Sequence, residues 1–396
     1  MGMASQKIVL VSNPGSASRK YGLYRGDEVL AELHFEYKDG KVVCTVSRAS
    51  HKATEPVSIE NLDDSIGLVA AQLQAAKVLT APDDIQAVAI RIVAPSGYFL
   101  QHRVINDEVL EQLKNLAKVA PLHIHSALRE IKELRSQFPN VPIVAVSDSK
   151  FHITKPDYAW NYGISLQDAD GYDIKRYGFH GLSMAAACRS LRQAEKLASK
   201  TVIVHLGSGA SVTALHGGKS MDNTMGYSPL EGLIMATRSG AIDYSAVRAL
   251  QISTGMKSAE IETYLNTRAG LLGLGGSADL RELLQREEAG DAQAALALKT
   301  YVYGVQKGIA QMVTALGGVD ALVFTGTVGE RSSIIRKRVV ARLHYLEFYM
   351  DETANLACKA PTTIETISKL AQSKPIYVVV ADEATEIARQ AAELLS

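Results

Sequence analysis

The chain has 396 residues, a length that favours two domains over one. Hydrophobic residues make up 47% of the sequence and charged residues 21%, which is enough apolar material for a sizeable core. Lys and Arg number 42, as do Asp and Glu, so the net charge is zero and gives no support for a nucleic-acid or membrane-surface partner. The three cysteines (Cys44, Cys188 and Cys358) are widely spaced and odd in number, which argues against a disulfide framework or a zinc site. No signal-peptide pattern or membrane-length apolar run occurs, so we expect a soluble, cytoplasmic protein.

The first predicted element is a hairpin. Residues 8–11 form an apolar run typical of a buried strand, and a small polar turn containing a glycine and two hydroxyls follows. After Arg19 and Lys20 the chain returns to an apolar, aromatic pattern, which predicts a second strand. Such a turn can direct backbone N–H groups, hydroxyls and cations at a phosphate, but a hairpin with a merely soluble turn has the same composition.

The rest of the first half alternates between strands and helices, which predicts an α/β fold. Strands are expected within 28–47, at 85–93 and at 141–146, helices at 62–78, 107–119 and 126–138, and a polar loop at 50–56. The strand at 141–146 delivers Asp148 to its carboxyl end. Ligand groups gather at such strand ends in α/β sheets.

The second half repeats the plan of the first hairpin. Residues 202–215 run from an apolar strand through Gly207, Ser208 and Gly209 into an alternating strand, and this second copy predicts a duplicated core with two phosphate-facing turns. The glycine- and methionine-rich stretch 225–238 is predicted to be a functional loop. Helices are expected at 183–197, 242–253, 258–265, 292–316 and from Glu383 to the C-terminus, and strands at 321–325 and 376–380. Residues 326–330 are expected to form a turn before a helix that Ser332 or Ser333 caps, which makes a third candidate nucleotide contact.

Motifs along nearly the whole chain resemble the acetate kinase family, within the superfamily of sugar kinases, Hsp70 and actin. They lie, in the family's order, at 13–21, 120–123, 148–152, 176–181, 205–209, 225–233, 237–240 and 323–330. The "YGFHG" and "PLEGL" stretches among them are specific, whereas the glycine turns are not. The resemblance implies two duplicated ribonuclease H-like (actin-like ATPase) domains with mixed sheets flanked by helices. The first would comprise 1–150 and 383–396, and the second, 151–382, would hold the nucleotide site and a homodimer interface.

The resemblance also implies a reaction, the reversible transfer of a phosphoryl group from ATP to acetate or another short carboxylate with Mg²⁺, giving acetyl phosphate and ADP. Because a carboxylate must attack a polyphosphate, such a site needs cations and oriented donors. The family's catalytic residues correspond to Arg91, Asp148, His180 and Arg238, and its metal-binding residues to Asn13, Asp148 and Glu383. The acyl pocket corresponds to Arg91, Val93, Leu122, Phe179 and Pro229. Phosphate and nucleotide contacts correspond to Ser16, Ser18, Lys20, His205, Gly207, Ser208, Gly209, Asp279, Arg281, Gly326, Thr327, Gly329 and Arg331.

Each of these residues also has a purely structural interpretation. An arginine is commonly a surface charge, Asp148 can cap a helix, Val93 can be core, and Asp279 with Arg281 can begin a solvated helix. The ordered set of motifs favours the functional interpretation.

The nucleotide side departs from the family pattern. Thr327 replaces a glycine, Arg331 and Ser208 each replace an asparagine, and a branched side chain at 327 would crowd a base or ribose. Three functions therefore stay open. The protein is an ATP-dependent kinase, a kinase that uses another phosphoryl donor such as pyrophosphate, or a catalytically inactive binding protein of the same fold. A sugar kinase would need a hydroxyl-activating aspartate and a polar pocket, whereas the pocket expected here is small and apolar.

Overall fold

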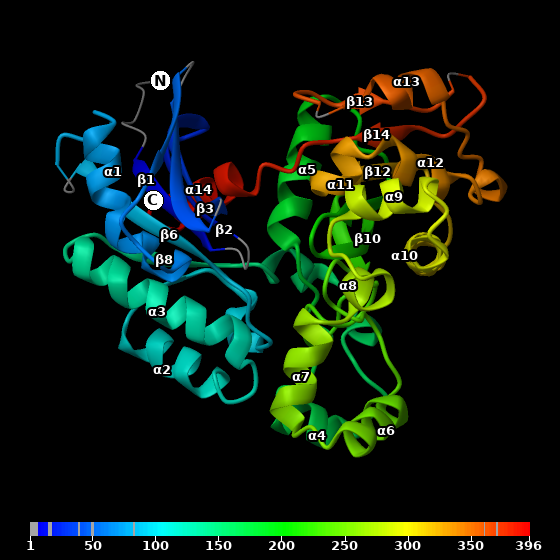
Figure 1. Ribbon diagram of the computed structural model, residues 1–396, viewed down its shortest axis with the longest axis horizontal. Coiled ribbons are helices and arrows are strands. Elements are labelled where there is room, and N and C mark those ends of the chain that lie inside the picture. The colour runs from blue at the N-terminus through cyan, green and yellow to red at the C-terminus, as the bar shows by residue number, and fades with distance from the viewer. Residues whose placement is uncertain are drawn as a thin grey trace. The chain divides into compact units, whose positions relative to one another are not determined.

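The computed structural model describes residues 7–14, 18–38, 40–48, 51–81, 84–359, 361–369 and 371–396, with the backbone alone for Pro14, His51, Asp63, Leu122 and His123. The chain forms two compact units (Figure 1). Unit 1 comprises Met1–Lys150 and Asp382–Ser396, and unit 2 comprises Phe151–Ala381. Of the helices in the described part of the chain, none combines the length and apolar character that crossing a membrane would require.

Unit 1 is built on an eight-stranded sheet in the order β5-β4-β3-β2-β1-β6-β8-β7. Its strands are β1 (Ile8–Pro14), β2 (Ser18–Arg25), β3 (Glu28–Lys38), β4 (Lys41–Arg48), β5 (His51–Pro56), β6 (Ala87–Ile92), β7 (Arg103–Val104) and β8 (Ile143–Ser147). The predicted hairpin is confirmed, because β1 and β2 pair antiparallel with Asn13 opposite Lys20. The loop expected at 50–56 is wrong. Residues 51–56 form β5, paired antiparallel with β4, and their charges and closing proline suit an edge strand that faces solvent.

Helices cover both faces of this sheet. They are η1 (Leu62–Leu68), α1 (Val69–Ala75), η3 (Gly97–Leu100), α2 (Asp107–Leu116), α3 (Pro121–Gln137) and α14 (Glu383–Leu394). Leu10 and Ile90 share one core with residues of α3. Val9 and Ala89 are their neighbours along the same strands, so they point to the other face of the sheet, where they are also buried. The C-terminal helix α14 packs against β1, β6 and β8 (Figure 1).

Two helices of unit 1 differ from the prediction. The helix expected at 126–138 begins five residues earlier, because Pro121 occupies the first helical turn, where a missing N–H costs nothing. The helix expected at 62–78 starts as the 3₁₀ segment η1 and becomes α-helical only at Val69.

Unit 2 repeats the strand arrangement of unit 1. Its six-stranded sheet has the order β11-β10-β9-β12-β14-β13, with strands β9 (Lys200–Leu206), β10 (Ala210–His216), β11 (Lys219–Asn223), β12 (Ala321–Thr325), β13 (Glu365–Thr366) and β14 (Ile376–Val378). In both units an antiparallel meander, of five strands in unit 1 and three in unit 2, is followed by two strands that extend the sheet parallel to its first strand. The predicted α/β class and the predicted duplication of the core are confirmed.

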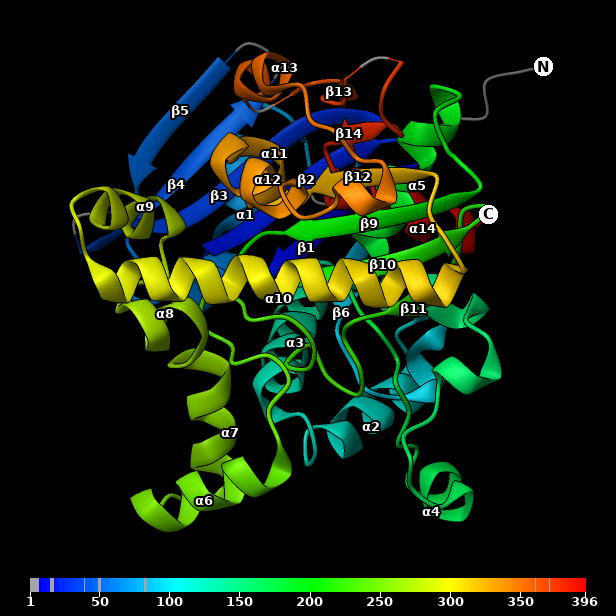
Figure 2. The same cartoon turned by 90° about the vertical axis from the view of Figure 1, so that its right-hand side faces the viewer.

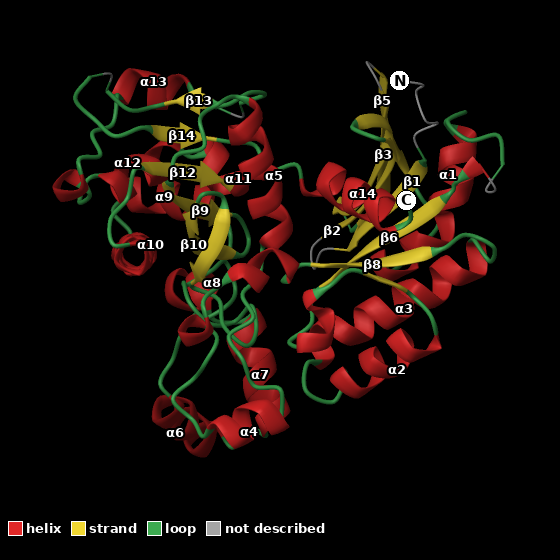
Figure 3. Ribbon diagram, turned by 180° about the vertical axis from the view of Figure 1, so that it is seen from behind, coloured by secondary structure: helices red, strands yellow, loops and turns green. Residues whose placement is uncertain are grey.

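Two helices sandwich the sheet of unit 2. Met184 and Leu191 of α5 (Gly181–Gln193) pack on Ile203, and the long helix α10 (Ala292–Leu316) brings Gly308 against Val212 on the opposite face (Figures 2 and 3). The remaining helices are η4 (Lys150–Thr154), η5 (Asp157–Ala159), α4 (Leu166–Gly171), α6 (Tyr244–Thr254), α7 (Ser258–Thr267), α8 (Gly270–Gly275), α9 (Leu280–Glu288), α11 (Gly326–Arg331), α12 (Ser333–Val340), η6 (His344–Leu346) and α13 (Glu352–Ala357).

The turn expected at 326–330 is wrong, because a helix, α11, starts directly after β12. Gly326 has φ +78° and lies so close to the preceding strand that a Cβ would stand 2.6 Å from the Leu206 carbonyl oxygen. Glycine therefore permits the sharp change from strand to helix that a longer turn would otherwise provide. Ser332 then caps α12 by accepting from the Ile335 N–H, as predicted.

Candidate active site

The parallel strands of unit 1 bring three of the predicted residues to one edge of the sheet. Ser12 is in register with Ile90, and Ile92 with Ser147. Asn13, Arg91 and Asp148 therefore each lie within one residue of the carboxyl end of β1, β6 and β8, respectively. The Asp148 N–H donates to the Ile92 carbonyl at 3.0 Å and continues the ladder beyond β8.

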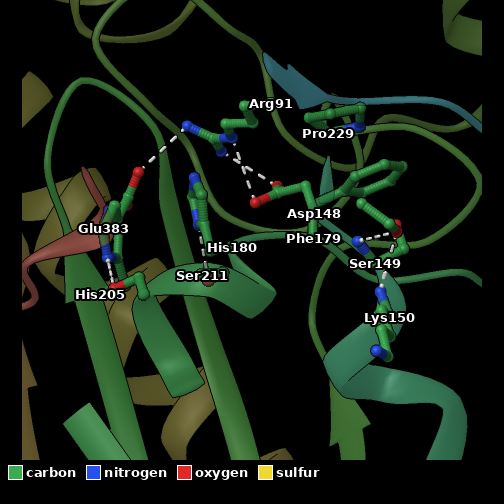
Figure 4. Close-up of polar contacts among 12 residues, drawn as sticks. Arg91, Asp148, Ser149, Lys150, Phe179, His180, His205, Ser211, Pro229 and Glu383 are labelled. Carbon is green, nitrogen blue, oxygen red and sulfur yellow. Dashed lines mark hydrogen bonds and ion pairs between the residues drawn. The ribbon is translucent and has the colours of Figure 1, made fainter. Parts of the chain in front are cut away.

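Arg91 is held between two carboxylates (Figure 4). Its Nε and Nη2 donate to Asp148 Oδ1 and Oδ2 at 3.1 and 3.0 Å, and its Nη1 donates to Glu383 Oε2 at 3.2 Å. Asp148 is fully buried, and α14 supplies Glu383 from its first turn. Burial opposes the charge of Arg91, but the two carboxylates outweigh it and raise the pKa of this guanidinium above its ordinary value. The cluster uses three of the five N–H groups of Arg91.

The described part of the chain contains no group of three or more His, Cys, Asp or Glu side chains arranged to hold a metal ion. Asp148 and Glu383 are two carboxylates that both contact the Arg91 guanidinium. Two carboxylates suffice for Mg²⁺, which keeps several waters and takes further oxygens from substrate phosphates.

In unit 2, two buried histidines are in ring contact, one at the start of α5 and one at the end of β9 (Figure 4). The rings of His180 and His205 have centroids 4.2 Å apart and are tilted by 30°. A serine hydroxyl holds Nδ1 of each ring, Ser211 for His180 at 2.9 Å and Ser183 for His205 at 2.8 Å.

His180 also has φ +61°, a left-handed conformation that a non-glycine residue rarely adopts. Backbone strain of this kind clusters at functional sites, and here it turns the chain from the 176–179 segment into α5.

The glycine turn of the second hairpin lies against His180. A Cβ on Gly209 would stand 3.0 Å from His180 Nε2 and 3.6 Å from Arg238 Nη1, so both side chains reach this turn. The Ala236 N–H donates to the Ser208 carbonyl at 3.2 Å and ties the 225–240 loop to the same turn. Unit 2 thus brings together His180, His205, the 207–209 turn and Arg238.

Close backbone contacts hold the loop that carries Arg238. Gly240 and Gly270 have φ +73° and +63°, and a Cβ on Gly270 would stand 2.3 Å from the Met235 carbonyl oxygen. The loop contains no helix or strand between 225 and 240, in agreement with the prediction.

The predicted acyl-pocket residues are divided between the units. In unit 1, Val93 is half-buried after β6, and Leu122 lies in the first turn of α3, where only its backbone is described. In unit 2, Phe179 and Pro229 are buried. The carbonyl of Phe179 is held by Nε2 of the buried His152 at 2.9 Å.

The predicted contacts of the first turn are described in part. Ser16 lies outside the described residues. Ser18 and Lys20 lie on β2, with Ser18 half-buried and Lys20 exposed opposite Asn13.

Helix α11, which follows β12 and carries four of the predicted nucleotide contacts, is capped by one of its own side chains. Glu330 Oε1 accepts from the Gly326 N–H at 3.1 Å and from the Ala381 N–H at 3.3 Å. Thr327 and Arg331 are exposed on this helix, whereas Gly326 and Gly329 are buried. Asp279 and Arg281 pair with each other, with Nη2 to Oδ2 at 2.6 Å, and Asp279 caps α9. This geometry fits the alternative of a solvated helix start.

The sequence did not single out several residues that organise these groups. They are Ser183 and Ser211 beside the histidines, the set Tyr162, Arg176 and Glu231, and the buried Arg336. Arg176 and Glu231 lie within the motifs at 176–181 and 225–233, and nothing else in the sequence indicated that they organise the site. Ser183, Ser211 and Arg336 have none beyond ordinary helical and strand patterns.

Comparisons with known proteins agree with this fold. The model of the acetokinase family matches residues 8–389. An acetate kinase of Streptomyces avermitilis is 37% identical over 402 residues, covering 96% of this chain and 96% of the relative. The crystal structure of a propionate kinase from Francisella tularensis matches with a TM-score of 0.88 and 32% identity over 98% of this chain and 99% of that one. That of Porphyromonas gingivalis acetate kinase matches with a TM-score of 0.85 and 30% identity over 98% of this chain and 100% of that one.

Fold and similarity together define a phosphotransferase with a carboxyl group as acceptor. The chain belongs to the acetokinase family. Membership implies ATP or ADP as a substrate and a divalent metal ion.

Proposed function

We propose that this protein is an acetate kinase, which transfers the terminal phosphoryl group of ATP reversibly to acetate or another short carboxylate and forms acetyl phosphate and ADP. The observation that carries the proposal is Arg91 held between Asp148 and Glu383 at the carboxyl ends of the parallel strands β6 and β8. A guanidinium suits an anionic acceptor because it can bind a carboxylate or a phosphate through two N–H groups, and the buried Asp148 with the half-buried Glu383 fixes the plane of Arg91.

The charge of this cluster supports Mg²⁺ as the metal. One guanidinium and two carboxylates leave a net charge of −1, which would repel both a carboxylate and a polyphosphate. Asp148 and Glu383 offer the oxygen ligands that Mg²⁺ prefers, and Asn13 lies next to the last residue of the neighbouring strand β1. When bound, Mg²⁺ would neutralise charge on the phosphate oxygens.

The residues of unit 2 would act on the transferring group. His180 Nε2 and the Arg238 guanidinium lie at the 207–209 turn and would donate to phosphoryl oxygens as charge builds on them. Phe179 and Pro229, with Val93 and Leu122, would contact the methyl group and favour acids of two or three carbons.

The test is hydroxamate formation from acetate, ATP, Mg²⁺ and hydroxylamine. The wild type should turn over, and Arg91→Gln and His180→Asn should each lower kcat by about 10²- to 10³-fold, the usual cost of losing one group that stabilises developing charge. A wild type that forms no hydroxamate with any phosphoryl donor would instead indicate a binding protein that kept the fold.

A second donor remains a candidate because of the exposed side chains on α11. Thr327 and Arg331 occupy the places where the family has a glycine and an asparagine, and Arg331 adds a cation that suits phosphate better than adenine. Assays with ATP, GTP and pyrophosphate in parallel distinguish the donors. Turnover with ATP at ordinary affinity, and none with pyrophosphate, would eliminate this alternative.

We assign the nucleotide site and a homodimer interface to unit 2. Helix α6 buries none of its residues, and its Tyr244 and Ile252 are 78% and 72% exposed. Figures 1 and 2 place α4, α6 and α7 at one end of this unit, where Leu166 and Tyr172 are exposed as well. An exposed apolar set of this kind is typical of an interface. Light scattering should give the mass of a dimer for the wild type and for Leu296→Glu, a control at another exposed apolar site, and of a monomer for Tyr244→Glu with Ile252→Glu.

We also place the enzyme in the cytoplasm. Cys44, Cys188 and Cys358 are buried and form no disulfide with one another, as is usual in a reducing compartment. Fractionation of cells that produce the protein tests this location.

A further inference from the structure

A carboxylate in unit 2 connects two of the segments assigned to the active site. Glu231 Oε1 accepts from Arg176 Nη1, and its Oε2 accepts from the Tyr162 hydroxyl. The side chains of Arg176 and Glu231 are only 25% and 28% exposed, so the pair is partly shielded from solvent. We call Tyr162, Arg176 and Glu231 the Glu231 clamp.

The clamp joins the segment that ends at His180 to the loop that carries Arg238. Arg176 begins the first segment, and Glu231 lies two residues after Pro229 in the second. Backbone contacts run beside the clamp: the Gly178 N–H donates to the Gly226 carbonyl at 3.2 Å, and the Tyr162 hydroxyl accepts from the Tyr227 N–H at 2.7 Å. The two segments therefore meet at Gly178 and Gly226 as well as at the clamp.

Gly226 leaves the room that the clamp needs. A Cβ at this position would stand 1.8 Å from Glu231 Oε2 and 2.3 Å from the Tyr162 hydroxyl oxygen. No side chain fits there without displacing the carboxylate, so backbone and clamp are built around one another.

The other side of Arg176 is anchored as well. Its N–H donates to the Trp160 carbonyl at 2.8 Å, and Lys155 Nζ donates to its carbonyl. Lys155 lies over the Trp160 ring at 4.4 Å, and Trp160 Nε1 donates back to the Lys155 carbonyl at 3.0 Å. Because these contacts fix the position of Arg176, its hydrogen bond to Glu231 also holds the 225–240 loop in place.

We propose that Glu231, through Tyr162 and Arg176, is a positioning residue that sets the separation of Phe179 and Pro229 and thereby the size of the acid accepted. This inference rests on the proposed function, in which Phe179 and Pro229 contact the acyl group. No atom of the clamp acts on the reacting groups. Its effect passes through the two segments that carry Phe179 and Pro229, so it should alter the use of the acid and leave binding of the phosphoryl donor unchanged.

Kinetics of Glu231→Gln, which keeps the size of the side chain, test the proposal. The variant should lower kcat/KM for acetate about tenfold, since small displacements of positioned groups are costly, and leave KM for the donor within about twofold. Its preference should shift toward propionate by about threefold or more, because a loosened wall admits another methylene. The matched control is Glu287→Gln, which removes a comparable pair with Arg338 (2.6 Å) elsewhere in unit 2 and should leave the acid preference unchanged. Equal losses toward acetate and donor, or an unchanged acid preference, would overturn the proposal.

Tyr162→Phe is a second variant for the case that Glu231→Gln does not fold, because it removes only one hydroxyl of the clamp. Hydrogen exchange of the amides adds a measurement that needs no activity. Exchange should become faster in both 176–181 and 225–240 in Tyr162→Phe, but in neither segment in Glu287→Gln. Acceleration confined to one segment, or absent, contradicts the clamp. A wild type without acetate kinase activity refutes the proposed function instead, and the exchange result still decides whether the clamp joins the segments.

Discussion

The fully buried Arg336 of α12 should be among the most sensitive positions of unit 2. Its guanidinium donates to the Gly329 and Glu330 carbonyls of α11, both at 2.8 Å, and to the Cys358 carbonyl beyond α13 at 2.8 Å. It also donates to the carbonyl and the side-chain oxygen of Asn355, at 2.9 and 2.8 Å. All five acceptors are neutral. They lie at the C-terminal ends of two helices, where the helix dipoles favour a cation.

Arg336→Met keeps most of the apolar stem and removes every donor. Each buried acceptor left unsatisfied costs about 1 kcal/mol or more, so the five together represent about 5 kcal/mol. Part of this is offset, because burial lowers the pKa of Arg336 and the variant no longer buries a charge. We therefore expect a net loss of about 3–5 kcal/mol, against a total stability of about 5–15 kcal/mol for a typical protein. Arg336→Lys, with three donors on one nitrogen, should fall between wild type and Met.

The assay is urea unfolding followed by the fluorescence of Trp160. Trp160 is the single tryptophan of the chain and lies in unit 2, so its emission reports on the unit that Arg336 stabilises. Arg331→Met, an exposed arginine on the adjoining helix, is the control and should stay within about 0.5 kcal/mol of wild type. An Arg336→Met protein within about 1 kcal/mol of wild type would show that the helix ends find other donors, and would refute the reasoning.

Three further predictions concern the site and its supports. Glu383→Gln should raise the Mg²⁺ concentration needed for half-maximal activity, measured by titration at saturating substrates, because it removes one of two carboxylates from the Arg91 cluster. Glu330→Gln should raise KM for the donor more than KM for acetate, since Glu330 caps the helix that carries Thr327 and Arg331; an unchanged donor KM would dissociate α11 from donor binding. The Ser147 N–H donates to Nδ1 of the buried His102, and burial, aided by Lys150, lowers the pKa of His102 to about 4. Between about pH 6.5 and 4 the unfolded chain then binds a proton that the folded chain does not, so the free energy of unfolding should fall by about 3 kcal/mol on acidification through this window, and His102→Asn should flatten that dependence.

Local sequence patterns predicted the elements whose residues alternate cleanly between apolar and polar. Both hairpins and the duplicated sheet follow from such runs, because a half-buried or buried strand needs them. The edge strand β5 escaped prediction because solvent-facing edges carry polar and charged residues, as loops do. Helix α11 escaped because Gly326 and Gly329 suggest a turn, and only the close approach of Leu206 explains why glycine is needed there.

The site was predictable only where a motif marked it. Glu383 and Arg91 are 292 residues apart, and no local pattern connects them; α14 brings the carboxylate to β6. Arg336 stands beside Lys337 and Arg338 in a basic run that suggests a solvated face. It is nevertheless buried, because helical period places it next to Ile335 and Val339 on the inner face of α12. A polar residue on an apolar face has no signal in sequence until its acceptors are known.

The two sides of the proposed reaction are constrained in different ways. On the acceptor side the charged groups are paired: Asp148 and Glu383 contact Arg91, and Glu231 contacts Arg176, so loss of either arginine leaves a buried or partly buried carboxylate without its cation. On the donor side, Gly326, Glu330 and Arg336 hold the backbone of α11, while the side chains of Thr327 and Arg331 are exposed. Those two residues can therefore change with little effect on folding. Donor choice is then free to vary on a helix whose position is fixed, and turnover with different donors is a sharper test of this side than any measurement of stability.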